Sequence, residues 1–198
     1  MISRTLEHEE RAGVEASARQ TAPGELELVR QFLNTHDVEE GLDEIATPDQ
    51  LRDWFAAHRL EAGADLGRGD VERATALREA LRALTLANNG EPLNGDALAT
   101  LNSVASRTQL LVRFDEDGHT VLEPAGKGAD AALGELLAIV FRSMAEGTWS
   151  RLKACRADTC QWAFFDRSKN RSGTWCSMSV CGNRAKARAY RRRQRHEA

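Results

Sequence analysis

The chain has 198 residues, and its content of 41% hydrophobic and 29% charged residues is typical of a soluble globular protein. Its apolar runs are too short to span a membrane, and no apolar secretory segment follows Met1, so we expect a cytoplasmic protein without a membrane partner. The net charge of −3 is unevenly spread: residues 151–198 hold 13 of the 27 Lys and Arg but three of the 30 acids, a net charge of +10, which leaves −13 on residues 1–150. This asymmetry predicts that the basic segment binds a polyanion, or docks on the acidic segment within one molecule or a dimer.

The first part of the chain combines a polar tail with one short helix. Residues 1–22 have scarcely any large apolar side chains, which predicts a flexible tail. A helix is expected after Pro23-Gly24, because apolar residues then recur at helical spacing as far as Leu33. Asn34 and Thr35 fall near its end, where such residues commonly terminate helices, although a role in binding a ligand is the alternative.

Four further segments of the acidic part have the capping residues or the apolar period of helices. The first is expected from Thr47, its cap, to about Ala62, and the second from Asp70, also a cap, to Asn88. The third is expected to start at Asn94 or Asp96, and the fourth to run from Asp130 to Glu146. The last is apolar on too many sides for a surface helix, which predicts a central helix or one partly buried in a homodimer.

Between the third and fourth of these helices the apolar period changes to that of strands. Residues 109–114 and 120–122 flank Asp117-Gly118, which predicts a β-hairpin with a tight turn. Nothing in residues 1–150 resembles a nucleophile elbow, a paired-histidine metal site or a glycine-rich nucleotide fingerprint. We therefore expect the protein not to be an enzyme.

All four cysteines lie in the basic segment, in two pairs with four residues between the members of each pair. In a reducing compartment this arrangement favours a metal over disulfides, and four thiolates satisfy tetrahedral Zn²⁺ without another ligand. Four ordinary buried thiols are the alternative, which so polar and basic a segment disfavours. The sequence thus predicts one Zn²⁺ per chain, bound by Cys155, Cys160, Cys176 and Cys181.

The residues around the cysteines suggest how so small a segment is stabilised. Residues 162–165 predict a short strand. We expect its aromatic residues Trp162, Phe164 and Phe165, together with Trp175, to supply an apolar core rather than to stack on bases. We also expect Asp166 and Arg184 to form an ion pair.

Strong helix formers follow Cys181, which predicts a zinc-anchored helix. Four of its arginines fall along one stripe of the helix, with a fifth on the flank. Like charges at these spacings repel one another unless an anion meets them, so the stripe suits the phosphates of nucleic acid; a solvated tail or docking on the acidic segment is the alternative. The candidate nucleic-acid contacts are Arg184, Lys186, Arg188, Arg191, Arg192 and Arg195.

These residues resemble a known family. Trp175-Cys176-Ser177-Met178, two spacers and Cys181-Gly182-Asn183-Arg184, preceded by Cys160-Gln161-Trp162 and by Asp166-x-Ser168, resemble the CGNR zinc finger of bacterial proteins. The upstream part resembles the helical ABATE domain that usually accompanies this finger, with Phe32-Leu33-Asn34-Thr35 matching its asparagine–threonine signature. The family is described as stress-induced transcription regulators, so the resemblance implies DNA binding and a role in stress response. The chain departs from the family pattern at Gly173-Thr174, where arginines usually precede the tryptophan.

The chain is thus expected to be mainly α: a helical domain with one small β-hairpin, followed by a small four-cysteine zinc finger that ends in a basic helix. The expected divisions are a tail over residues 1–22, an ABATE-like helical domain over 23–148 and the finger over 149–198. The predicted function is a bacterial transcription regulator that binds DNA through the finger, with the helical domain sensing a small-molecule effector at Asn34 and Thr35. The alternative is a small-ligand-binding or protein-interaction module in which the finger is purely structural.

Overall fold

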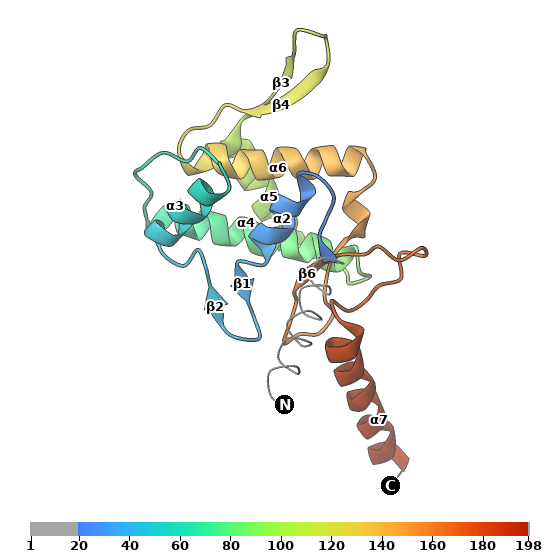
Figure 1. Cartoon of the computed structure of the whole chain (residues 1–198). Helices are drawn as coiled ribbons and strands as arrows, with labels where there is room; N and C mark the ends of the chain where they lie inside the picture. The colour runs from blue at the N-terminus through green and yellow to red at the C-terminus, as the bar shows by residue number, and fades with distance from the viewer. Residues whose placement is uncertain (1–19, 198) are drawn as a thin grey trace, which may run out of the picture.

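The helical part of the molecule is built around one apolar helix, α6 (Ala129–Ala145), and the finger lies to one side of it (Figure 1). The computed structural model describes residues 20–197, so residues 1–19 of the predicted tail lie outside the described residues. Of the remainder of that tail, Ala22 is buried and its backbone N–H donates a hydrogen bond to Glu27. The other helical segments of this range are α2 (Leu26–Leu33), α3 (Pro48–Ala57), α4 (Arg68–Ala87), α5 (Gly95–Thr108), α7 (Asn183–Glu197) and the short turns η1 (Trp149–Arg151) and η2 (Met178–Gly182).

The strands of residues 20–197 form three separate antiparallel pairs. These are β1 (His36–Asp37) with β2 (Leu42–Asp43), β3 (Leu110–Phe114) with β4 (Thr120–Pro124), and β5 (Leu152–Ala154) with β6 (Ala163–Phe165). The pair β3–β4 is the predicted hairpin and stands out from the helices at the top of Figure 1. The small sheets leave the protein mainly α, as the sequence predicts.

Helix α6 lies in the core, as its apolar sequence predicts. It packs against α2, α4, α5 and β4, and Leu133 and Leu136 are fully buried. Gly134 is needed for the contact with the hairpin, because a Cβ there would come within 2.6 Å of the Pro124 side chain. Phe141 and Met144, near the C-terminal end of the helix, remain exposed. Within residues 20–197, no helix combines the length and the apolar character needed to cross a membrane.

Two predicted helix ends differ from the structure. The helix that Thr47 caps was expected to run to about Ala62, but α3 ends at Ala57, and Arg59 then adopts a left-handed backbone conformation with φ of 58°. Asp70 was expected as a cap, but Gly67 occupies the cap position. Asp70 stabilises the same helix end from three residues inside, where its carboxylate accepts the Gly67 N–H at 2.8 Å.

The finger is packed directly onto the helical part. Strand β5 contacts α4, and β6 contacts α2. Four apolar finger residues, Trp149, Leu152, Ala163 and Phe165, belong to the same buried cluster as the helices. The finger is therefore positioned by the main core rather than hanging from a linker.

Candidate metal centre and nucleic-acid surface

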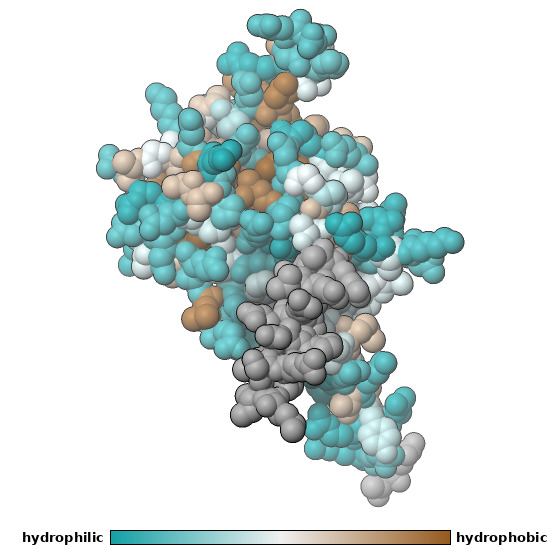
Figure 2. All heavy atoms as spheres, in the orientation of Figure 1, coloured by the Kyte–Doolittle hydropathy of each residue, from teal (hydrophilic) through white to brown (hydrophobic). Residues whose placement is uncertain are grey.

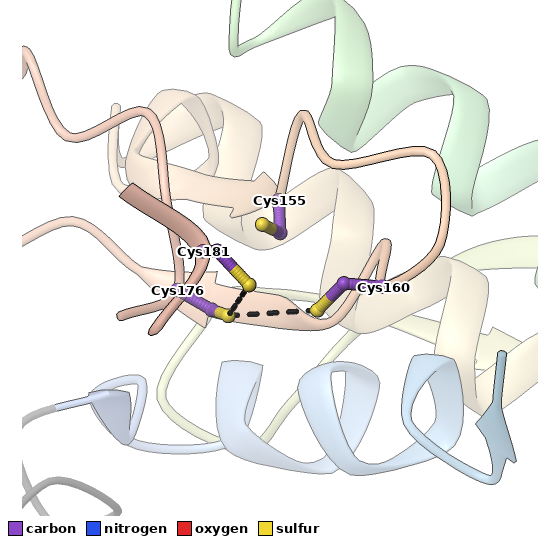
Figure 3. Close-up of side chains that lie close together, drawn as sticks. All are labelled: Cys155, Cys160, Cys176 and Cys181. Atoms are coloured by element: carbon purple, nitrogen blue, oxygen red, sulfur yellow. Dashed lines mark hydrogen bonds between the residues drawn. The ribbon is translucent and has the colours of Figure 1, made fainter. Parts of the chain in front are cut away.

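The four cysteines converge from two short loops (Figure 3). Cys155 follows β5 and Cys160 lies in the turn before β6, while Cys176 precedes η2 and Cys181 lies within it. Their sulfur atoms all lie within 4.8 Å of one another; the Cys160 and Cys176 sulfurs are 3.6 Å apart and those of Cys176 and Cys181 are 3.7 Å apart. A disulfide needs ~2.05 Å between its sulfurs, so these are four separate thiols.

The spacing of the sulfurs fits one zinc ion. Tetrahedral coordination with Zn–S bonds of ~2.3 Å places the sulfurs ~3.8 Å apart, close to the distances observed. Cys155, Cys160 and Cys181 are buried and Cys176 is half-buried. Four protein ligands leave no position for a substrate, so zinc held here supplies structural support.

The mutual repulsion of the four cysteines in their ionised, thiolate form also favours a bound cation. Hydrogen bonds with Cys160 and Cys176 hold the pKa of Cys155 well below its usual range. The same interaction raises the pKa of Cys160 and of Cys176, and burial raises that of Cys181. Four thiolates this close repel one another, and a divalent cation removes that conflict because it stabilises all four at once.

Local hydrogen bonds and aromatic packing shape both cysteine loops. The Cys155 N–H donates to the Trp162 carbonyl at 2.9 Å, and the Cys160 N–H donates to the Ala157 carbonyl at 2.8 Å. Trp162 and Trp175 are partly buried against the cysteine cluster, which confirms that they supply its apolar core. Phe165 instead belongs to the buried cluster of the helices.

Polar side chains of the helical part bind the finger's backbone. Asn34 donates to the Ala163 carbonyl at 3.0 Å and accepts its N–H at 2.7 Å. Arg82, only 2% exposed, donates to the Gln161 carbonyl at 2.8 Å, and Asn89 donates to the Ala154 and Thr174 carbonyls. These contacts fix both cysteine loops relative to α2 and α4.

The two candidate ligand contacts are thus already engaged within the protein. Asn34 is bound to Ala163 of the finger. Thr35 is buried; its hydroxyl donates to the Phe32 carbonyl at 2.8 Å and accepts from Arg78 at 3.0 Å. Arg78 in turn forms a two-pronged ion pair with Asp43, with both distances 2.8 Å.

The expected ion pair between Asp166 and Arg184 is wrong. Asp166 is buried and pairs with Lys153, whose Nζ lies 2.8 Å from the carboxylate. Arg184 is on the surface and pairs with Glu39 of the β1–β2 loop at 2.5 Å. The Lys153 side chain is itself buried, so it meets Asp166 where water is excluded and an ion pair is stronger.

Helix α7 carries the predicted basic residues into solvent. It extends away from the rest of the molecule at the lower right of Figure 1, and its described surface in Figure 2 is mostly hydrophilic. Four side chains line an open hollow along this helix: Arg188, Arg191, Arg192 and Arg195. Lys186 is exposed as well, and Arg184 lies at the base of the helix beside Glu39. Of the six predicted nucleic-acid contacts, Arg184 forms an ion pair with an acid. Within residues 20–195, the other five form no ion pair.

Sequence reasoning missed the residues that dock the finger. Arg82, Asn88 and Asn89 all contact the finger's backbone through buried or half-buried groups, and Asn88 donates to the Trp149 and Leu152 carbonyls. Arginines within a helix usually indicate a solvated face, and Asn88-Asn89-Gly90 indicates a helix stop. The sequence therefore offered no signal that these side chains point toward the finger.

Taken together, the fold and the site define a helical domain that carries a four-cysteine zinc-binding module on its surface. Residues 26–147 match the model of the ABATE family, described as "Putative stress-induced transcription regulator", and residues 151–194 match the CGNR zinc finger. The chain belongs to the ABATE family, because that match covers more than half of its length, and it carries a CGNR zinc finger after the helical domain. No curated protein matches the chain.

Proposed function

We propose that the protein is a transcription regulator that acts by binding duplex DNA through its finger, and not by catalysis. The observation that carries this proposal is the exposed arginine side of α7, where Arg188, Arg191, Arg192 and Arg195 surround one open hollow. Uncompensated like charges along a helix cost stability, and a phosphate backbone supplies the missing anions.

The dimensions of α7 suit a DNA groove. The helix has 15 residues and is therefore about 22 Å long. A major groove of ~12 Å width admits one helix, and basic residues on the helix then reach the phosphates on its edges. The zinc site holds the base of this helix, because the ligand Cys181 lies about one turn before Arg184.

A small-molecule effector sensed by the helical domain is the second part of the proposal. Asn34 and Thr35 are the predicted contacts, and Asn34 is also bound to the finger. A ligand that competed for Asn34 would loosen its bonds to Ala163 and change the support of the zinc site. This gives the effector a direct route to the DNA-binding surface.

Binding of a fluorescently labelled duplex, followed by anisotropy over a range of salt concentrations, tests the proposal. If about five phosphates are neutralised, log K should fall against log salt with a slope near −4 to −5, and Arg188→Ala/Arg191→Ala/Arg195→Ala should flatten it. The matched control, Arg68→Ala/Arg113→Ala/Lys127→Ala, removes three exposed charges from the helical part and should leave the slope unchanged. Absence of DNA binding at low salt would refute the proposal and favour a protein-interaction module in which α7 docks on an acidic partner.

A further inference from the structure

The loop between β6 and Trp175 is a second basic projection of the finger. Residues 167–173, here called the basic loop, contain Arg167, Lys169 and Arg171 and no acid. All three side chains are exposed. In Figure 1 this loop extends sideways from the finger, above the start of α7 and away from the helices.

A buried ion pair holds this loop in shape. Lys153 and Asp166 are each 4% exposed. Lys153 Nζ donates to Asp166 at 2.8 Å and to the carbonyls of Arg171 at 2.6 Å and Gly173 at 3.1 Å. Asp166 accepts the N–H groups of Ser168 at 2.9 Å and Gly173 at 2.8 Å. Both ends of the loop are thus tied to one buried pair.

Gly173 is part of that arrangement. A Cβ at this position would lie 2.8 Å from the Asp166 carboxyl carbon, closer than real Cβ contacts. The carboxylate and the backbone of residue 173 therefore lie in direct contact, and the loop has little freedom where it returns to the cysteines.

The charges of the loop are left without acids. Asp166, the carboxylate that directly precedes the loop, is turned inward and neutralised by Lys153. Arg167 donates to the Thr21 carbonyl at 2.8 Å and stands 5.7 Å from the Phe165 ring centre, while Arg171 donates to the Ser150 hydroxyl at 3.3 Å. None of the three forms an ion pair within residues 20–197, whereas Arg156 and Arg184 of the same finger pair with Glu91 and Glu39.

We propose that the basic loop is a second phosphate-binding element, which contacts the DNA backbone while α7 occupies the groove. The inference rests on the proposed function. Arginine binds a phosphate through two parallel hydrogen bonds and lysine binds it as a point charge, so a loop carrying both suits a sugar-phosphate backbone. Its rigid attachment matters because phosphate contacts fix how a protein is oriented on the duplex.

The loop and the helix are held at a fixed relative position. Only Thr174 and Trp175 separate Gly173 from the ligand Cys176, and α7 begins two residues after the ligand Cys181. The Asn89 bond to the Thr174 carbonyl, at 2.9 Å, also anchors the end of the loop to α4. A single rigid unit therefore presents both groups of positive charge, which predicts one continuous footprint rather than two independent contacts.

The test uses the full-length zinc-loaded protein and a labelled duplex of about 20 base pairs, with Lys169→Ala/Arg171→Ala compared against Arg68→Ala/Lys127→Ala. Both pairs remove two exposed charges, but the second lies on the helical part. Loss of two phosphate contacts should make the salt slope shallower by about 1.8, so that between about 50 and 200 mM salt the parent loses roughly tenfold more affinity than the variant. Zinc content and melting temperature, measured on the same samples, establish that the variant is folded.

The outcomes separate the two proposals. If the parent binds and the α7 variant flattens the slope while the loop variant behaves like its control, the basic loop is not a phosphate-binding element and the proposed function stands. If the parent fails to bind DNA, both proposals fall. Loss of binding to anionic vesicles in the loop variant, with DNA binding unchanged, would assign the loop to a lipid surface and overturn the inference.

Discussion

Asn34 at the end of α2 pairs with Ala163 of β6 as one strand residue pairs with another. Its side-chain oxygen accepts the Ala163 N–H at 2.7 Å, and its side-chain NH₂ donates to the Ala163 carbonyl at 3.0 Å. A single amide group thus satisfies both backbone groups of a residue that is fully buried. The relationship joins the helical domain to the loop that carries Cys160.

Asn34→Ala should destabilise the protein. The change leaves the buried N–H of Ala163 unpaired and its carbonyl with only the 3.5 Å hydrogen bond from Arg30, which costs about 2 kcal/mol. Chemical denaturation measures the free energy of unfolding, and Asn102→Ala, at an exposed position of α5, is the matched control. An Asn34 variant as stable as that control would show that the pairing contributes nothing to docking the finger.

Removal of zinc should lower the stability of the helical domain as well as that of the finger. Without the metal the cysteine loops lose their shape, and Leu152, Ala163 and Phe165 withdraw from the shared core. We expect Cys181→Ser, or chelation, to lower the melting temperature of the helical signal by about 10 °C or more, since burial of Leu152 and of Phe165 contributes ~1.5–3 kcal/mol each.

Circular dichroism during heating, with elemental analysis of the same samples, makes this measurement. The parent should hold one zinc per chain, and adding Zn²⁺ back after chelation should restore the original transition. Melting of the helices at an unchanged temperature after complete zinc loss would contradict the shared core.

The ion pair of Asp43 with Arg78 should make stability depend on pH. Burial alone would raise the pKa of Asp43, but hydrogen bonds from Arg78 and from the Ile45 N–H outweigh it and lower the pKa below its ordinary value of 3.8. A carboxyl group whose pKa is lower in the folded state stabilises the protein above the ordinary value, and this contribution disappears as the pH falls through the folded-state pKa.

Asp43→Asn should therefore cost about 2 kcal/mol of unfolding free energy near neutral pH, because Arg78 is buried and loses a charged partner. The difference from the parent should shrink as the pH is lowered below about 3.8. Denaturation midpoints at several pH values measure it, with the exposed Asp53→Asn as the control. A difference that stayed constant across this pH range would exclude the charge as its source.

Glu39→Gln should strengthen DNA binding modestly. Glu39 holds Arg184 at the base of α7 and places negative charge beside the surface proposed to meet phosphates. The substitution frees one arginine, so the salt slope should become steeper by up to about 0.9 and the affinity at low salt should rise a few-fold. Anisotropy titrations compare it with Glu61→Gln, which removes an exposed acid from the helical part. Weaker binding by Glu39→Gln would mean that Arg184 must be held by Glu39 to act.

The features that sequence predicts well here are those that local pattern controls. The cysteine spacing predicts a metal site because metal ligands must meet whatever the rest of the fold, and their sulfurs do lie within 4.8 Å of one another. The hairpin β3–β4 follows from alternation around Asp117-Gly118, and α6 follows from its apolar run. In each case neighbours along the chain decide the outcome.

The features that sequence did not predict depend on contacts between distant segments. Lys153 lies in a three-residue strand, and nothing local indicates that its amine is buried against Asp166. Arg82 reaches the Gln161 carbonyl across 79 positions, so only the packing of α4 against the finger reveals its role. The end of α3 at Ala57 has a local cause instead: Arg59 takes a left-handed conformation in a cap where the Leu60 N–H donates to the Phe55 carbonyl at 2.9 Å. Glycine usually occupies that position in such a cap, so the arginine does not mark it in the sequence.

The shared buried cluster also decides how the chain can be divided. Leu152, Ala163 and Phe165 lie against the helices, so a fragment that began after residue 148 would leave these side chains facing water. The same cut would leave a matching apolar hollow on the helices that remained. The finger therefore cannot be moved to another protein as an independent domain. Its sequence carries the metal ligands, but the helical domain supplies part of the apolar core that surrounds it.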